Sequence, residues 1–145
     1  MSSQGGDFTF RYAFVSGATF NAAQLTRTGW EQMTPLESDP VSASFTPSPI
    51  VAASFLQLDN PNVVLSTWKR AESGDGSILR LTEIAGHSEA VRLSFPHLQL
   101  IRAQQCSLLE LCERNLSTDN GSVTLELKPY EILTVHLETQ PEETP

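Results

Sequence analysis

The chain has an ordinary domain length and a strongly acidic composition. Its 145 residues can bury roughly 68–70% of the surface that the unfolded chain exposes. Its formal charge of −8 makes the surface repel phosphate backbones and anionic lipid. We therefore expect a globular domain whose partners include neither nucleic acid nor membrane.

The two ends of the chain carry no structural pattern. Residues 1–6 contain no basic and no apolar run, so we expect no signal peptide, and we interpret this segment as disordered or as an engineered addition. From the missing signal we expect a cytoplasmic location. Residues 7–138 are expected to form one domain, and the acidic, proline-bearing residues 139–145 a disordered tail.

The N-terminal third predicts one strand and one short helix. Aromatic residues alternate with other residues over 8–14, which is typical of a strand with one apolar face. Residues 18–29 predict a short helix with Thr19 as its cap. Residues 34–49 hold four prolines among serines and acidic residues, so we expect an irregular surface connection there.

Strand patterns follow one another from residue 50 onward. Residues 50–58 and 63–70 are separated by turn-forming residues over 59–62, which predicts a hairpin. Residues 63–70 and 78–84 are also expected to be adjacent strands, because two glycines lie between them. Three more strands are predicted over residues 91–95, 99–103 and 108–112.

The C-terminal part predicts a last pair of strands. Apolar residues alternate with polar ones over 123–127, after the turn Asp119-Asn120-Gly121, and again over 133–137, which predicts a second hairpin. About eight or nine short strands at roughly 10-residue spacing, with one brief helix, indicate an all-β fold. We expect an antiparallel β-sandwich with at most one short helix.

Cys106 and Cys112 are the only cysteines of the chain. Two cysteines do not make a disulfide framework, and they could form a bridge only if the fold brings their Cα atoms within about 7 Å. The simpler interpretation is two reduced, half-buried thiols.

Three blocks of sequence follow one another in a set order. They are residues 63–70 (VVLSTWKR), 79–86 (LRLTEIAG) and 128–135 (KPYEILTV). In this order and spacing they resemble the C-terminal β-sandwich of family 38 glycoside hydrolases, the α-mannosidases. Thr82 is a departure, since the family usually has an aromatic residue at that place.

The resemblance implies a non-catalytic C-terminal domain of a larger retaining glycoside hydrolase. The catalytic barrel of such an enzyme holds zinc and an aspartate nucleophile, and neither has a counterpart here. We therefore expect no catalytic residue, no metal ligand and no cofactor in this segment, with the zinc in the absent catalytic domain. The expected partner is the barrel of the same polypeptide, and the substrate of the parent enzyme is a mannose-containing glycan. The alternative is a stand-alone carbohydrate- or protein-binding β-sandwich that uses Trp30 or Trp68.

Four side chains are candidates for a glycan cleft or an inter-domain contact: Arg80, Glu83, Glu131 and Trp68. Strand alternation places both glutamates on apolar faces, where a charge needs a cation or hydrogen-bond donors. One of them could reach a glycan-facing cleft, or both could be internal ion pairs or lie at strand-end bulges. Trp68, in mid-strand, fits core or inter-domain packing better than sugar stacking. The available cations are Lys69, Arg70, Arg80 and Arg102.

Overall fold

The structure is a computed structural model that describes residues 5–10, 12–34, 37–38 and 54–141. The chain divides into two compact units, Met1–Ser38 and Asp39–Pro145. Most of the expected N-terminal lead and most of the expected connection over 34–49 lie outside the described residues, so these two expectations stay predictions.

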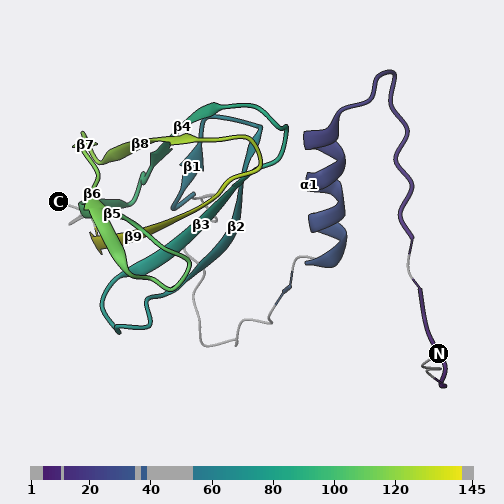
Figure 1. Cartoon of the computed structure of the whole chain (residues 1–145), viewed down its shortest axis with the longest axis horizontal. Coiled ribbons are helices and arrows are strands. Elements are labelled where there is room, and N and C mark those ends of the chain that lie inside the picture. The colour runs from purple at the N-terminus through teal and green to yellow at the C-terminus, as the bar shows by residue number, and fades with distance from the viewer. Residues whose placement is uncertain (1–4, 11, 35–36, 39–53, 142–145) are drawn as a thin grey trace, which may run out of the picture. The chain divides into compact units, whose positions relative to one another are not determined.

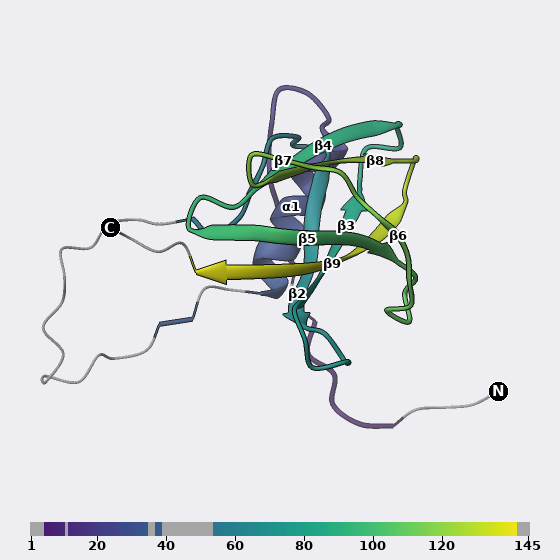
Figure 2. The same ribbon diagram turned by 90° about the vertical axis from the view of Figure 1, so that its left-hand side faces the viewer.

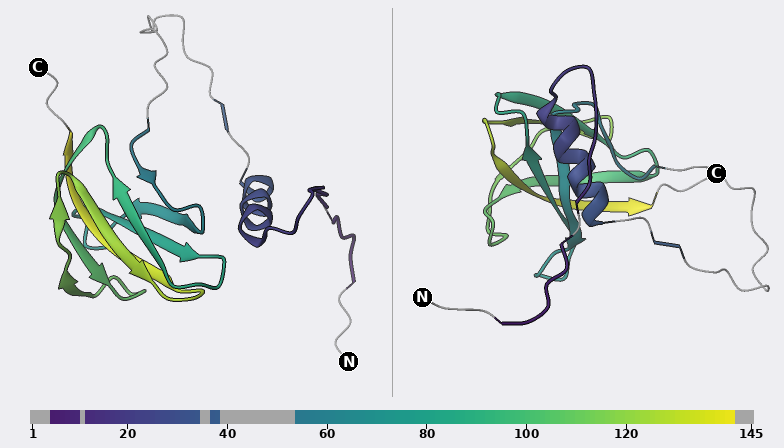
Figure 3. Two further views of the ribbon diagram at one scale, coloured as in Figure 1. Left: turned by 90° about the horizontal axis from the view of Figure 1, so that it is seen from above. Right: turned by 90° about the vertical axis from the view of Figure 1, so that its right-hand side faces the viewer.

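The first unit contains one α-helix, α1, over Ala22–Met33 (Figure 1). Figure 3 shows this helix from its end and from its side. The predicted helix is present, but it begins later than expected. Asn21, and not Thr19, is its cap, because the Asn21 side-chain oxygen accepts the N–H of Gln24 at 2.9 Å.

The strand predicted over residues 8–14 is wrong. The described residues of this segment, 8–10 and 12–14, belong to no strand, and their aromatic side chains are exposed, Phe14 to 95%. A strand needs a neighbouring strand to pair its backbone N–H and C=O groups. An alternating pattern does not by itself supply that neighbour.

The second unit is an antiparallel β-sandwich, as the sequence predicts. One sheet has the strand order β1-β4-β8-β7 and lies in the upper part of the sandwich in Figure 1; the other has the order β2-β3-β9-β5-β6 and lies below it. The first sheet consists of β1 (Gln57–Leu58), β4 (Glu89–Ser94), β7 (Thr118–Asp119) and β8 (Ser122–Leu127). The second consists of β2 (Val63–Arg70), β3 (Ser77–Glu83), β5 (Leu98–Cys106), β6 (Cys112–Asn115) and β9 (Ile132–Pro141).

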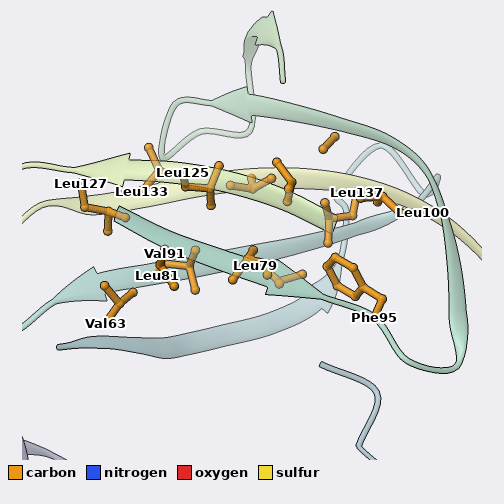
Figure 4. Close-up of a cluster of buried hydrophobic side chains, with 14 residues drawn as sticks. Val63, Leu79, Leu81, Val91, Phe95, Leu100, Leu125, Leu127, Leu133 and Leu137 are labelled. Carbon is orange, nitrogen blue, oxygen red and sulfur yellow. The ribbon is translucent and has the colours of Figure 1, made fainter. Parts of the chain in front are cut away.

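The hydrophobic core lies between the two sheets (Figure 4). Alternate residues of each strand point into it, which is the period-two pattern that the sequence shows. The four-stranded sheet contributes Val91, Leu93, Val123, Leu125 and Leu127, and the five-stranded sheet contributes Val63, Leu79, Leu81, Leu100, Ala103, Leu133, Val135 and Leu137. We call this side of the five-stranded sheet its inner face and the opposite side its outer face.

Both predicted hairpins at the sandwich ends are wrong, for one reason. β1 pairs with β4 and not with β2, and β9 pairs with β3 and β5 and not with β8. In each case the intervening turn carries the chain from one sheet to the other. The periodicity of a strand indicates which of its faces is buried, but it does not say which strand lies beside it.

The other strand predictions agree with the structure to different degrees. The adjacency of β2 and β3 is confirmed. The strand predicted over 50–58 is described only from residue 54, and there it is reduced to β1. The strand predicted over 108–112 is wrong, because residues 107–111 form a loop and β6 begins at Cys112. β9 extends through Pro141, so residues 139–141 of the expected disordered tail pair with β5.

Candidate functional site

The carboxylate of Glu83, at the end of β3, is deeply buried. The residue is 1% exposed and lies on the inner face, as does Leu81 two positions earlier. Its oxygens accept the backbone N–H groups of Ala85, Gly86 and Tyr130 at 2.7, 2.8 and 2.8 Å. The donors that a buried charge needs are therefore supplied by the backbone and not by a cation.

Backbone hydrogen bonds also set the charge state of Glu83. Burial would raise the pKa of this carboxyl, but the N–H groups of Tyr130, Ala85, Gly86 and His87 outweigh it and lower the pKa below its usual value. Gly86 has φ +80°, and a Cβ atom there would collide with the ring of Tyr130. Glu83 thus links the turn after β3 to the turn before β9 through hydrogen bonds. Two of the three sequence blocks, 79–86 and 128–135, are in contact at this point.

Glu131 lies at the same junction. Its backbone C=O accepts the N–H of Glu83 at 3.0 Å, and its carboxylate accepts the N–H of Lys128 at 2.7 Å. β9 begins only at Ile132, after a turn in which Tyr130 has φ +58°, so the strand alternation that put Glu131 on an apolar face does not extend this far. The half-buried side chain of Glu131 therefore stabilises the turn that precedes β9, through its hydrogen bond with the Lys128 N–H.

Arg80 lies on the outer face of the five-stranded sheet. It is opposite Thr134 of β9, which is in turn opposite Cys106 of β5, so these three side chains share that face. Residues 107–111, which we call the strap, leave the sheet at Cys106 and fold back over it. Arg80 Nη2 donates to the backbone C=O of Leu108 at 2.9 Å. In Figure 2 the strap extends below β9, toward the turn between β2 and β3.

Glu110 fastens the strap to the far edge of the sheet. Its carboxylate lies 2.7 Å from Lys69 Nζ on β2 and accepts the N–H of Glu72 at 2.8 Å. The Glu72 N–H, followed by Lys69, lowers the pKa of Glu110, and Glu110, followed by Glu72, raises the pKa of Lys69. Glu110 itself has φ +64°, which is uncommon for a residue with a side chain. The strap therefore reaches from β5 across to β2.

A disulfide between Cys106 and Cys112 closes the strap at its base. The expectation of two reduced thiols is wrong, because the residues are opposite each other on β5 and β6 and their Cα atoms are 3.9 Å apart. The strap itself was missed in the sequence. Its signal is the segment Leu108-Leu109-Glu110-Leu111 between the two cysteines, which has no period-two alternation.

Polar atoms remain unpaired on the outer face. Among the described residues, Arg80 Nε, Thr134 Oγ1 and His136 Nδ1 are buried without a hydrogen-bond partner. His136 Nε2 lies 2.8 Å from the C=O of Asp75, in the turn between β2 and β3. The strap and this turn thus cover a face that is partly polar, whereas an apolar layer covers the inner face.

Trp68 lies on the edge strand β2, opposite Leu79, and is 40% exposed on the inner-face side. The four candidate residues therefore do not form one site. Glu83 and Glu131 meet at one end of β3, Arg80 lies on the outer face, and Trp68 lies at the edge of the inner face. None of the expected cations pairs with either glutamate: Lys69 contacts Glu72 and Glu110, and Arg102 contacts Glu138 at 3.4 Å. Arg70 and Arg80 donate to the backbone C=O groups of Gly74 and Leu108.

A surface hollow of about 760 Å³ lies beside Glu131. Its charged lining residues are Glu89, Glu113, Arg114, Glu126, Lys128 and Glu131, and it has no aromatic side chain that could stack on a sugar ring. Over the described parts of the chain, no group of three or more His, Cys, Asp or Glu residues could hold a metal ion. The one described helix is too short and too polar to cross a membrane.

A comparison with protein-family models gives a match. The family model of the glycosyl hydrolases family 38 C-terminal beta sandwich domain matches residues 62–135, just over half of the chain. The matched segment runs from the start of β2 into β9 and contains both turns that Glu83 joins. No curated protein matches the chain.

Proposed function

We propose that this chain, which belongs to the family of glycosyl hydrolases family 38 C-terminal beta sandwich domains, is the non-catalytic C-terminal domain of an α-mannosidase-like retaining hydrolase. Its role is to support the catalytic part of the same polypeptide. The family match over residues 62–135 carries this proposal.

The use of Glu83 supports a structural role. Two of the three family-like blocks, 79–86 and 128–135, contact each other through the carboxylate of Glu83. A general acid or base needs access to substrate and a pKa near the working pH. Glu83 has a lowered pKa, and its carboxylate oxygens accept hydrogen bonds from backbone N–H groups, so its role is to stabilise the fold.

The chemistry of the parent enzyme is proposed to lie outside this segment. A catalytic barrel would hold the zinc and the carboxylates that cleave a mannose-containing glycan, and this domain would pack against it. Arg80, Glu131 and Trp68 are at least partly accessible, and they are the residues that could approach the edge of the glycan cleft. Glu83 is too enclosed to do so.

Trp68 favours a second candidate function, a stand-alone module that binds carbohydrate or a protein. An indole that is 40% exposed at a sheet edge can stack on a sugar ring. A free-standing sugar-binding module should show saturable binding of methyl α-mannoside that Trp68→Ala abolishes, with Ile101→Ala as a control at another exposed apolar position. A domain severed from its enzyme should bind no free sugar.

The mass of the native polypeptide tests the proposal directly. An antibody raised to the purified chain should detect, in extract of the native source, a band several-fold heavier than 15.9 kDa. Immunoprecipitate of that band should release mannose from a mannoside substrate. A native band at 15.9 kDa would overturn the enzyme-domain proposal in favour of the stand-alone module.

A further inference from the structure

The turn between β7 and β8 consists of an asparagine followed by a glycine. Asn120 and Gly121 lie between the paired residues Asp119 and Ser122, and their φ values are +46° and +71°. Positive φ at both central positions is characteristic of a type I′ hairpin turn, and asparagine followed by glycine is the pair that such a turn favours. The hairpin thus selects this pair of residues for its conformation.

Both groups that can react within this pair are accessible. The side chain of Asn120 is exposed, and a Cβ atom built at Gly121 would meet nothing within 4 Å. Among the hydrogen bonds of the described residues, none engages the Asn120 carboxamide or the Gly121 N–H. Because Gly121 has no side chain, little opposes the rotation that brings its nitrogen to the Asn120 Cγ.

Two other asparagines lie in the turn before β2, and both are held. Asn60 is followed by Pro61, which has no N–H, and its side-chain nitrogen donates to Glu89 at 2.8 Å. Asn62 donates to the same carboxylate at 2.6 Å and is followed by Val63, which is fully buried and β-branched. In both cases the carboxamide is engaged, and the next nitrogen lacks a proton or is enclosed.

The remaining two asparagines are held as well. Asn21 Oδ1 accepts the N–H of Gln24 at 2.9 Å as the cap of α1. Asn115 Oδ1 accepts a side-chain N–H of Gln104 at 3.0 Å, and the N–H of the next residue, Leu116, donates to a backbone C=O of β5 at 2.9 Å. The structure describes all five asparagines of the chain, and only Asn120 combines a free carboxamide with an unhindered N–H beside it.

We propose that Asn120 is the site at which this chain deamidates spontaneously, through a succinimide closed by the backbone nitrogen of Gly121. Hydroxide takes the Gly121 N–H proton, and the nitrogen attacks Asn120 Cγ to form a C–N bond. The Cγ–Nδ2 bond breaks, and Nδ2 takes a proton from water and leaves as ammonia. A water molecule then opens the ring at either carbonyl, which yields aspartate or isoaspartate. The net reaction consumes one water and releases one ammonia, without oxidation or reduction.

The two products change the turn in different ways. Aspartate keeps the backbone and adds a negative charge beside Asp119. Isoaspartate routes the backbone through the side chain, so it adds a methylene group to a loop of two residues. β7 is a two-residue strand at the end of its sheet, where it pairs with β8. The register of such a pair depends on the length and type of the turn, so isoaspartate should release β7 from the sheet.

Peptide mapping of the folded 145-residue chain during storage in mildly alkaline buffer tests the site. Cleavage after Arg114 places Asn115 and Asn120 in one peptide, so both are compared in the same spectrum. Residue 120 should gain the mass difference between NH2 and OH several-fold faster than residue 115, and electron-transfer fragmentation should find isoaspartate in the product. An unchanged Asn120, or conversion of Asn115 that equals it, would overturn the proposal.

Two matched variants attribute the reaction to one residue. Asn120→Gln lengthens the side chain by a methylene group, so closure would require a larger and slower ring. It should remove most of the acidic form that anion exchange separates from the stored chain. Asn115→Gln should leave the rate of that charge change as it is. A charge change that persists in Asn120→Gln would place the modification at another residue and would overturn the proposal.

Hydrogen exchange measures the consequence for the sheet. In the purified isoaspartate form, amides of Asp119 and Ser122 should exchange several-fold faster than in the fresh chain, whereas Val135 in β9 should be unchanged. Equal exchange at Ser122 in both forms would overturn the predicted release of β7.

Discussion

The two faces of the five-stranded sheet are covered to different extents and by different means. The inner face meets the second sheet through a continuous apolar layer in which Leu79, Leu81 and Val135 are fully enclosed. The outer face is covered only in part, by the strap, which Arg80, Glu110 and a disulfide hold above polar atoms that stay unpaired. Area burial thus stabilises the first face, and a few directed contacts stabilise the second.

This difference has a practical consequence. Apolar contacts are numerous and tolerant of solvent conditions, whereas the strap depends on a few groups that can be reduced, protonated or substituted one at a time. The inner face should therefore set the global stability of the sandwich. The strap should detach locally from the outer face while the sandwich remains folded.

The largest effect should come from the inner face. Leu81→Ala removes a fully buried side chain and leaves a cavity, and should lower the free energy of unfolding by about 2–5 kcal/mol. Urea unfolding followed by circular dichroism measures this loss. Ile132→Ala, at a position that is 52% exposed, is the control and should cost less than about 0.5 kcal/mol. Similar losses in both variants would contradict the contrast between the faces.

A substitution of Glu83 should give the second-largest loss of stability. Glu83→Gln removes the charge that accepts three backbone N–H groups and should cost about 2–3 kcal/mol at pH 7. Glu126→Gln, on an exposed position of β8, is the matched control.

The pH dependence of the Glu83 variant follows from its pKa. Because folding lowers the pKa of this carboxyl from 4.5, its contribution is fully present above about pH 4.5 and is lost as the pH falls through the lowered value. The stability gap between wild type and Glu83→Gln should narrow as the pH falls below 4.5. A gap that persists unchanged down to pH 2 would show that shape, and not charge, is responsible.

Removal of the disulfide at the base of the strap should lower the free energy of unfolding somewhat less. Cys106→Ser with Cys112→Ser removes the closure of a short loop and should lower the free energy of unfolding by about 2 kcal/mol. Reduction of the wild-type chain should reproduce the loss. Non-reducing peptide mapping of the native protein should find the two cysteines linked, and free thiols at both positions would contradict the bridge.

The smallest effect should be local. Glu110→Gln removes the carboxylate charge beside Lys69 and should speed amide hydrogen exchange of the strap without changing the unfolding midpoint beyond experimental error. Glu113→Gln, an exposed position of β6, is the control. Unchanged exchange at Leu108, Leu109 and Leu111 would mean that the disulfide alone holds the strap.

Prediction from sequence succeeded for most strands of the sandwich, whose patterns are local, although the same kind of pattern failed over residues 8–14. The alternation in β3, β4, β8 and β9 identified strands and their buried faces, because the side-chain period of a strand requires no knowledge of its neighbours. The order and spacing of the three sequence blocks identified the family, and the match over residues 62–135 confirms it. The cytoplasmic location stays a prediction.

Only the tertiary structure decided which strands pair and what covers the outer face. The chain changes sheet at the turns before β2 and before β9, and no periodicity encodes that choice. Glu83 and Tyr130 are distant in sequence, as are Lys69 and Glu110, so neither contact leaves a local pattern. The sequence by itself determined strands, buried faces and family; the partners of its buried charges depended on long-range packing, because a charge is satisfied by whatever group the fold brings within hydrogen-bond distance.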